Sequence, residues 1–168
     1  MRERISLVAV AAVALGVGVA VTGSSNQSLA DDGDRHEPEF SDPTDIDNKY
    51  LPLTKFDRCE LAGEDEGAEI RVVRTLLDRT EKFKFDGDKV RVAVIRDKEW
   101  EDGELVERTL DYFGQGDNGN VYYFGEDVDD YENGEIVGHD GEWRYGRDTN
   151  KLGLIMPDNP KIGDTWRP

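Results

Sequence analysis

The chain has 168 residues, with 38 Asp or Glu against 21 Lys or Arg, so its formal net charge is -17. A length of this order is typical of one domain. Nucleic-acid binding depends on Lys and Arg that displace cations from the phosphate backbone, and an acidic surface repels phosphate. The composition therefore argues against nucleic acid and anionic membrane surfaces as partners.

Residues 1–30 carry the features of a secretory signal peptide. Arg2 and Arg4 precede an uncharged apolar stretch, and residues 28–30 form a small-x-small cleavage site. The alternative is an uncleaved anchor, because residues 5–21 reach the lower limit of length for a membrane span. We therefore expect a secreted or extracytoplasmic protein, with membrane contact only if the signal segment is retained.

Residues 31–48 are predicted to be an acidic disordered spacer. They contain many acids and one base, Arg35, and such a composition buries too little apolar surface to offset the entropy lost on ordering. The folded domain is then expected over residues 49–168. Its single cysteine, Cys59, is interpreted as a small buried apolar residue, with an intermolecular disulfide or a reactive thiol as the alternatives.

The remaining pattern is that of strands and tight turns. Apolar residues recur at the two-residue period of a strand along residues 69–78 and 89–95. No segment after the signal combines a helical period with caps. Four dipeptides suit hairpin turns: Asp102-Gly103, Asn118-Gly119, Asn133-Gly134 and Asp140-Gly141. The sequence predicts a mainly β fold, a single antiparallel meander sheet that is curved or half-barrel-like, with little helix after the signal peptide.

The turn positions also predict a register. A two-residue turn at Asp102-Gly103 places opposite-charge and apolar pairs across the hairpin. These pairs are Trp100 with Leu105, Lys98 with Glu107, Asp97 with Arg108, Ile95 with Leu110, and Ala93 with Tyr112. The turn at Asn118-Gly119 likewise predicts that Phe113 lies opposite Phe124.

Few residues could support nucleophilic catalysis. Ser41 is the only serine after the signal and lies in the predicted spacer, and His139, beside a turn, is expected to be exposed. One Cys and two His give no zinc-ligand spacing.

The glycines of residues 114–119 match a dinucleotide fingerprint but precede a strand-like run, so we interpret them as a hairpin loop. The inventory favours a non-enzymatic protein without a resident cofactor, although abundant carboxylates keep glycosidase chemistry open.

Four clustered acids form a candidate calcium site. They are Glu126, Asp127, Asp129 and Asp130. Calcium prefers carboxylate oxygens, but the sequence lacks the spacing of a calcium-binding loop. The alternative interpretation is a solvated acidic segment.

Four aromatic residues form a candidate ligand pocket. They are Tyr112, Phe113, Tyr123 and Trp143. In a small β domain such residues usually build the core, but a curved sheet can also enclose an apolar ligand. Both interpretations remain open.

Several segments resemble a group of exported bacterial proteins of unassigned function. The resemblance covers nearly all of residues 48–166 and implies no established activity, cofactor or catalytic residue. The chain departs from the pattern at residues 55–61, where the group has a Gly-Thr-Thr-Trp-like entry to its first strand. The segments that carry the resemblance include Asn48-x-Tyr50-Leu51-Pro52-Leu53, Gly119-Asn120-Val121-Tyr122-Tyr123-Phe124-Gly125-Glu126 and Met156-Pro157-x-Asn159-Pro160.

These features lead to one preferred function and two alternatives. We expect a secreted or cell-surface binding or interaction protein, without enzymatic activity, whose curved sheet holds a small apolar ligand or another envelope protein. The first alternative is a carboxylate-dependent hydrolase of extracellular glycans, with an acid of raised pKa. The second is a calcium-dependent surface protein.

Overall fold

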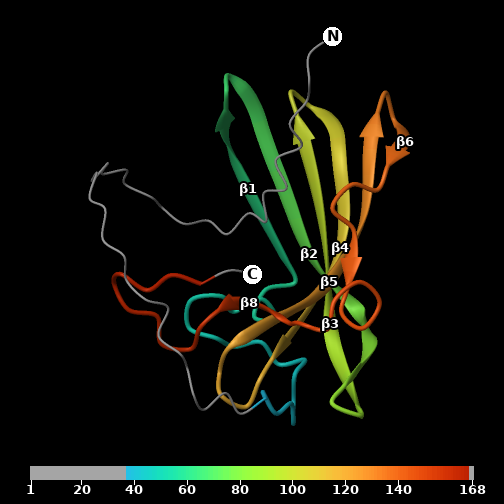
Figure 1. Ribbon diagram of the computed structural model, residues 1–168. Helices are drawn as coiled ribbons and strands as arrows, with labels where there is room; N and C mark the ends of the chain where they lie inside the picture. The colour runs from blue at the N-terminus through green and yellow to red at the C-terminus, as the bar shows by residue number, and fades with distance from the viewer. Residues whose placement is uncertain (1–36, 167–168) are drawn as a thin grey trace, which may run out of the picture. The chain divides into compact units, whose positions relative to one another are not determined.

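The computed structural model describes residues 37–166, which form one antiparallel sheet of eight strands and its connecting loops. The order across the sheet is β1-β2-β3-β4-β5-β6, and β7 and β8 also pair with β5 (Figure 1). The predicted mainly β meander is confirmed, and the sheet does not close into a barrel. The strands are β1 (Arg58–Asp65), β2 (Ala68–Phe85), β3 (Asp88–Glu101), β4 (Glu104–Gln115), β5 (Val121–Glu132), β6 (Glu135–Gly138), β7 (Trp143–Arg144) and β8 (Gly153–Met156).

The predicted signal peptide lies outside the described residues, as does the first part of the predicted spacer. Within residues 37–166, no helix has the length and apolar character needed to cross a membrane.

Tight turns join β1 to β2, β2 to β3, β3 to β4 and β5 to β6. Both turn residues have positive φ in each of four hairpins, which is the conformation of the turns that match strand twist. Two of these turns were predicted from the sequence. The other two predicted dipeptides, Asn118-Gly119 and Asp140-Gly141, have positive φ only at the glycine, and Asn118-Gly119 belongs to a longer loop. The four turns are Glu66-Gly67, Asp86-Gly87, Asp102-Gly103 and Asn133-Gly134.

The register between β3 and β4 differs from the predicted one. Trp100 does pair with Leu105, but a bulge follows, so that Ile95 lies opposite Asp111 rather than Leu110. Because side chains alternate between faces, this one-residue shift moves every later residue of β4 to the other face relative to β3. A second bulge, between β4 and β5, places Phe113 opposite Tyr123 instead of Phe124.

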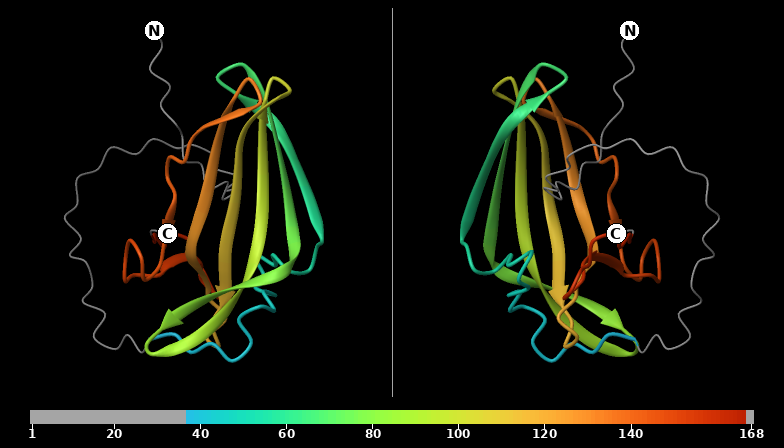
Figure 2. Two further views of the ribbon diagram at one scale, coloured as in Figure 1. Left: turned by 90° about the vertical axis from the view of Figure 1, so that its right-hand side faces the viewer. Right: turned by 90° about the vertical axis from the view of Figure 1, so that its left-hand side faces the viewer.

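The sheet is curved, as predicted. The pairing of β2 with β3 shifts between Leu76 and Thr80, and beyond this bulge the end of the hairpin bends away from the other strands (Figure 2). The bend packs an apolar cluster on one face of the sheet, which we call the aromatic face. Its buried residues are Phe83, Val90, Val92, Val94, Tyr112 and Phe124.

The compact unit begins at Pro38, ahead of the predicted start at residue 49. Ile46 has no exposed surface and Asn48 is buried. The side-chain amide of Asn48 donates hydrogen bonds to the carbonyls of Gly119 and Pro157, at 2.9 and 3.2 Å. The segment after Pro38 is therefore ordered rather than a spacer, because its few apolar residues insert into the core of the sheet.

Cys59 also differs from its expected environment. It lies on the edge strand β1 and is exposed, so it does not serve as a small core residue.

Candidate functional site

Carboxyl groups face one another across β3, β4 and β5, on the side of the sheet opposite the aromatic face. Glu99 is the register partner of Glu107, and Glu107 is the partner of Asp130. Further along the same strands, Asp111 is the partner of Glu126. Directly opposed side chains in a sheet have Cβ atoms about 4.5–5.5 Å apart, so these groups are crowded. We call this surface the acidic face; Asp97 of β3 also belongs to it.

Arg74 is the base that β2 contributes to the acidic face. Its guanidinium binds Asp97 through Nε at 3.0–3.1 Å and through Nη2 at 2.6 Å, and both side chains are largely buried. Burial disfavours the charged guanidinium, but Asp97 holds the pKa of Arg74 above its ordinary value. Arg74 therefore neutralises Asp97, and within residues 37–166 no ion pair neutralises Glu99, Glu107, Asp111 or Glu126.

Asp111 and Glu126 form the buried end of the acidic face, with exposed fractions of 7% and 6%. The hydroxyl of Tyr123 donates a 2.5 Å hydrogen bond to Asp111 Oδ1, and the hydroxyl of Thr109 donates a 2.7 Å bond to Oδ2. Both carboxyl oxygens of Asp111 therefore accept hydrogen bonds from the protein, although the side chain is closed off from water.

Aromatic rings cover this pair of acids. The ring of Tyr123 stacks on Phe113 at 4.6 Å and meets Trp143 edge-on at 5.3 Å. Trp143 is also the register partner of Glu126 across the β5–β7 pairing. The pair thus lies beneath side chains from β4, β5 and β7.

The acids of this face hold protons more tightly than ordinary carboxyl groups. Burial, reinforced by the charge of Asp97, raises the pKa of Asp111 to about 6. Burial and the charge of Asp111 raise the pKa of Glu126 to about 7. Burial and the neighbouring Glu99 raise the pKa of Glu107 to about 7 as well. Near neutral pH these carboxyl groups are therefore only partly ionised.

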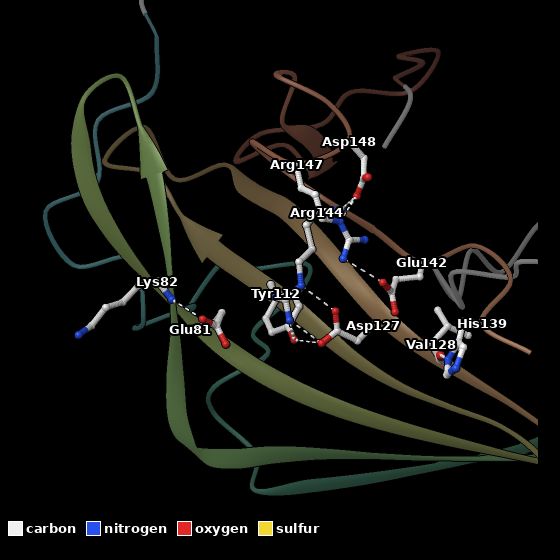
Figure 3. Close-up of polar contacts among 10 residues, drawn as sticks. All are labelled: Glu81, Lys82, Tyr112, Asp127, Val128, His139, Glu142, Arg144, Arg147 and Asp148. Carbon is white, nitrogen blue, oxygen red and sulfur yellow. Dashed lines mark hydrogen bonds and ion pairs between the residues drawn. The ribbon is translucent and has the colours of Figure 1, made fainter. Parts of the chain in front are cut away.

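The aromatic face carries a different network, in which acids are neutralised by arginine (Figure 3). Arg144 binds Asp127 through two hydrogen bonds of 2.7 and 2.5 Å and donates a third, of 2.7 Å, to the hydroxyl of Tyr112. The guanidinium also lies over the Tyr112 ring, at 4.6 Å from its centroid. Such bidentate, stacked arginine contacts hold β7 in place.

The four aromatic residues of the predicted pocket do not line one cavity. Tyr112 belongs to the aromatic face, where it packs on Phe83, whereas Phe113, Tyr123 and Trp143 lie together on the acidic face. Phe113 and Tyr123 are buried. The adjacency of Tyr112 and Phe113 in a strand already implied opposite faces.

The structure also separates the acids of the predicted calcium site. Glu126 and Asp130 point to the acidic face, whereas Asp127 and Asp129 point to the aromatic face and pair with Arg144 and Arg108 respectively. Within residues 37–166, no three acid, His or Cys side chains are placed to hold a metal ion. The alternation of a continuous strand explains this separation.

A polar hollow of about 220 Å³ lies beside the β4–β5 loop. The amide and hydroxyl of Ser41 donate to the same oxygen of Asp117, at 2.9 and 2.7 Å, so this acid is already satisfied. A lining of this kind does not suit an apolar ligand. It is formed by Ser41, Asp42, Asp45, Gln115, Gly116, Asp117 and Gly119.

Sequence reasoning missed Glu99, Glu107 and Asp111. The acids of residues 97–101 alternate at the period of a strand, which indicates an acidic face. The bulges, however, decide which acids of β4 join that face.

Comparisons with protein-family models, with curated proteins and with solved structures give no match. Function is therefore inferred from the acidic face itself.

Proposed function

We propose that this protein is a secreted or cell-surface, non-enzymatic interaction protein whose acidic face binds a cationic segment of another envelope protein. The observation that carries the proposal is the row in which Glu99, Glu107 and Asp130 oppose one another. Like charges directly opposite in a sheet are destabilising. Natural sequences break such local rules mainly where function requires it.

A cationic partner would relieve this repulsion. The row is only partly buried, and the exposed Glu101 and Glu104 extend it towards the β3–β4 turn. Adjacent strands lie about 4.7–4.9 Å apart, so the acids form a regular array that suits several positive side chains at once. A small apolar ligand is less compatible with this surface, because the aromatic residues of the acidic face are packed against one another.

The charge of the whole chain supports the same proposal. A formal net charge of -17 attracts a cationic partner over a distance comparable to the screening length and increases the rate of association. Binding of this kind weakens as ionic strength rises.

The test measures the affinity of a fluorescent oligolysine peptide for the folded domain at low and high salt. We expect salt-sensitive binding that weakens at least about tenfold in the double variant Glu107→Gln/Asp130→Asn. The matched control, Glu64→Gln/Asp88→Asn, removes the same charge outside the row and should change the affinity little. Equal losses of affinity in the two double variants would show that binding depends on net charge alone and not on the row. Absence of peptide binding by the wild-type protein would overturn the proposal.

A carboxylate-dependent hydrolase of extracellular glycans is the second candidate. It is favoured by the raised pKa values of Asp111 and Glu126, because a protonated acid beside an ionised one suits general acid–base chemistry. Burial of both acids counts against it, since a substrate must reach them. Turnover of envelope polysaccharides that disappears in Glu126→Gln would support this candidate, and inactive wild-type protein would remove it.

A further inference from the structure

Strand β1 is the long open edge of the sheet. It pairs with β2 on one side, and among residues 37–166 no strand lies along its other side (Figure 1). Seven of its eight residues are exposed. The opposite edge differs, because three short strands, β6, β7 and β8, pair there with successive parts of β5. β1 therefore offers the longest unpaired backbone of the described sheet.

The unpaired backbone groups alternate along β1. The carbonyl of Asp57, just before the strand, accepts a 3.0 Å hydrogen bond from the amide of Leu76 in β2. In an antiparallel pair, every second residue directs its backbone groups to the same neighbour. The odd-numbered residues of β1 therefore bond to β2. The outward-pointing amides and carbonyls belong to Arg58, Glu60, Ala62 and Glu64.

This edge lacks the usual protection against pairing with another strand. Proteins protect long edges with Pro, Lys, a bulge or a covering segment. β1 contains neither Pro nor Lys, and its pairing with β2 has no register shift. Its exposure shows that nothing covers it.

The charge of β1 changes sign along its length. At its start, Arg58 and Arg71 share one acid, Glu60, through ion pairs of 2.6 Å. Near its end, Glu64 lies opposite Glu69 of β2, and no ion pair within residues 37–166 neutralises it. Such a strand is complementary to an antiparallel copy of itself, because the positive start of one lies beside the negative end of the other.

We propose that β1 pairs antiparallel with β1 of a second copy of this chain, about a twofold axis at Leu61, so that two sheets join into one. The axis is perpendicular to the sheet, so the acidic faces of both copies lie on the same side. The inference stands independently of the proposed function, because β1 contributes no acid to the row of Glu99, Glu107 and Asp130.

Charge and backbone pairing both favour the axis at Leu61. Arg58 of each copy then lies opposite Glu64 of the other, and Glu60 lies opposite Ala62. These are the residues with outward-pointing backbone groups, and each such pair exchanges two hydrogen bonds. The two Leu61 side chains, partly exposed in the single chain, meet at the axis. Opposite charges and apolar side chains across a strand pair are stabilising.

Other positions of the axis are less favourable. An axis at Glu60 places this acid opposite its own copy, and an axis at Ala62 places Glu60 opposite Glu64. Like charges directly opposite are destabilising. Axes at Cys59 or Gly63 lie near the ends of β1, so fewer of its residues can pair.

The first test is sedimentation equilibrium of the purified protein under reducing conditions, from about 1 µM to about 500 µM, a range that covers weak association. We expect a reversible dimer with a micromolar dissociation constant, since a single strand pair buries little surface. A protein that remains monomeric over the whole range would overturn the proposal, as would assembly beyond the dimer without a dimer plateau.

Charge variants test the register. Glu64→Arg places like charges opposite one another at both ends of the interface, so it should raise the dissociation constant at least about tenfold, although it makes the net charge less negative. Glu135→Arg on β6 changes the net charge equally and should not weaken the dimer. The exchange Arg58→Glu/Glu64→Arg restores opposite charges and should return the dissociation constant to within about threefold of the wild type. An exchange variant as weak as Glu64→Arg would overturn the register.

A disulfide provides an independent test of the same register. Cys59 lies opposite Gly63 of the second copy, in a pair whose Cα atoms are about 4.5 Å apart, within the range that a disulfide spans. Within one chain the two positions are about 13 Å apart along β1 and cannot be bridged. A Cβ at Gly63 meets no neighbouring atom, so Gly63→Cys should fold.

Under mild oxidation, Gly63→Cys should form a covalent dimer, and peptide mass spectrometry should find Cys59 linked to the introduced thiol. The matched control, Ala62→Cys, places its thiol on the other face of β1 and should cross-link no faster than the wild type. Equal cross-linking of the two variants, or links only between the two Cys59 side chains, would overturn the proposed pairing.

Discussion

At the scale of a residue, the hydroxyl of Tyr123 is a donor on which the buried Asp111 depends. Its ring is fixed between Phe113 and Trp143, and its hydroxyl reaches Asp111 at 2.5 Å. The acid and the hydroxyl depend on one another, because neither is exposed to water that could replace the bond. The same acid raises the pKa of Tyr123, after burial, so this phenol stays protonated and keeps donating.

Tyr123→Phe should lower the free energy of unfolding by about 1–3 kcal/mol, since it leaves a buried acceptor without its donor. Loss of the donor should also raise the pKa of Asp111 further. Urea unfolding measures the first effect. The control is Tyr122→Phe on the opposite face, whose hydroxyl accepts bonds from Asn118 and Asn120 in a loop, so its cost should be smaller. Equal costs for the two variants would show that the bond to Asp111 adds nothing.

At the scale of an element, Gly125 determines whether β7 can lie on β5. Its φ is +129°, and a Cβ at this position would collide with the carbonyl of Trp143 and the Cα of Arg144. The bulge of β5 lies directly before this glycine. A glycine thus permits the close approach of two backbones that places Trp143 on one face and Arg144 on the other.

Gly125→Ala should separate β7 from β5 and lower the free energy of unfolding by about 1–3 kcal/mol, the cost of a strained backbone or an overpacked contact. Thermal unfolding and the exposure of Trp143 to acrylamide measure the two effects. Gly63→Ala on β1 is the matched control, because its added Cβ meets no neighbouring atom and its φ is not in the left-handed region. A buried Trp143 in the Gly125 variant would contradict the proposed role of this glycine.

At the scale of the whole molecule, two groups of acids act in opposite directions on stability. Glu107, Asp111 and Glu126 have folded pKa values of about 6 to 7, above the values of the unfolded chain. Their contribution is fully present below the unfolded pKa and is lost as pH rises through the folded pKa. Asp127 has a pKa lowered by Arg144, so its contribution is lost as pH falls.

We therefore expect maximal stability at about pH 5, with a decrease of more than about 1.4 kcal/mol by about pH 8, given that one pKa unit corresponds to about that free energy. Urea unfolding at several pH values measures the curve. Glu107→Gln should flatten its alkaline side, whereas Glu64→Gln, which lies outside the acidic face, should not. A curve that rises steadily from pH 5 to pH 8 would contradict the raised pKa values.

The sequence by itself determined the class of the fold, because a period of two residues and turn dipeptides such as Asp102-Gly103 and Asn133-Gly134 act locally. It also determined the net negative charge and the small number of side chains that could act as nucleophiles or zinc ligands. The ordered segment after Pro38 could not be recognised in this way, because Phe40 is held by ring contacts with Phe85, Tyr122 and Phe124, which lie far along the chain.

Only the tertiary structure decided which side chains meet. The bulge between β3 and β4 places Asp111 beside Ile95, and the bulge between β4 and β5 places Tyr123 on the face of Phe113 instead of the face of Tyr112. A register shift of one residue exchanges the two faces of a strand, yet it changes the local sequence pattern very little. The acidic face therefore follows from long-range pairing, whereas the strands that carry it follow from local preference.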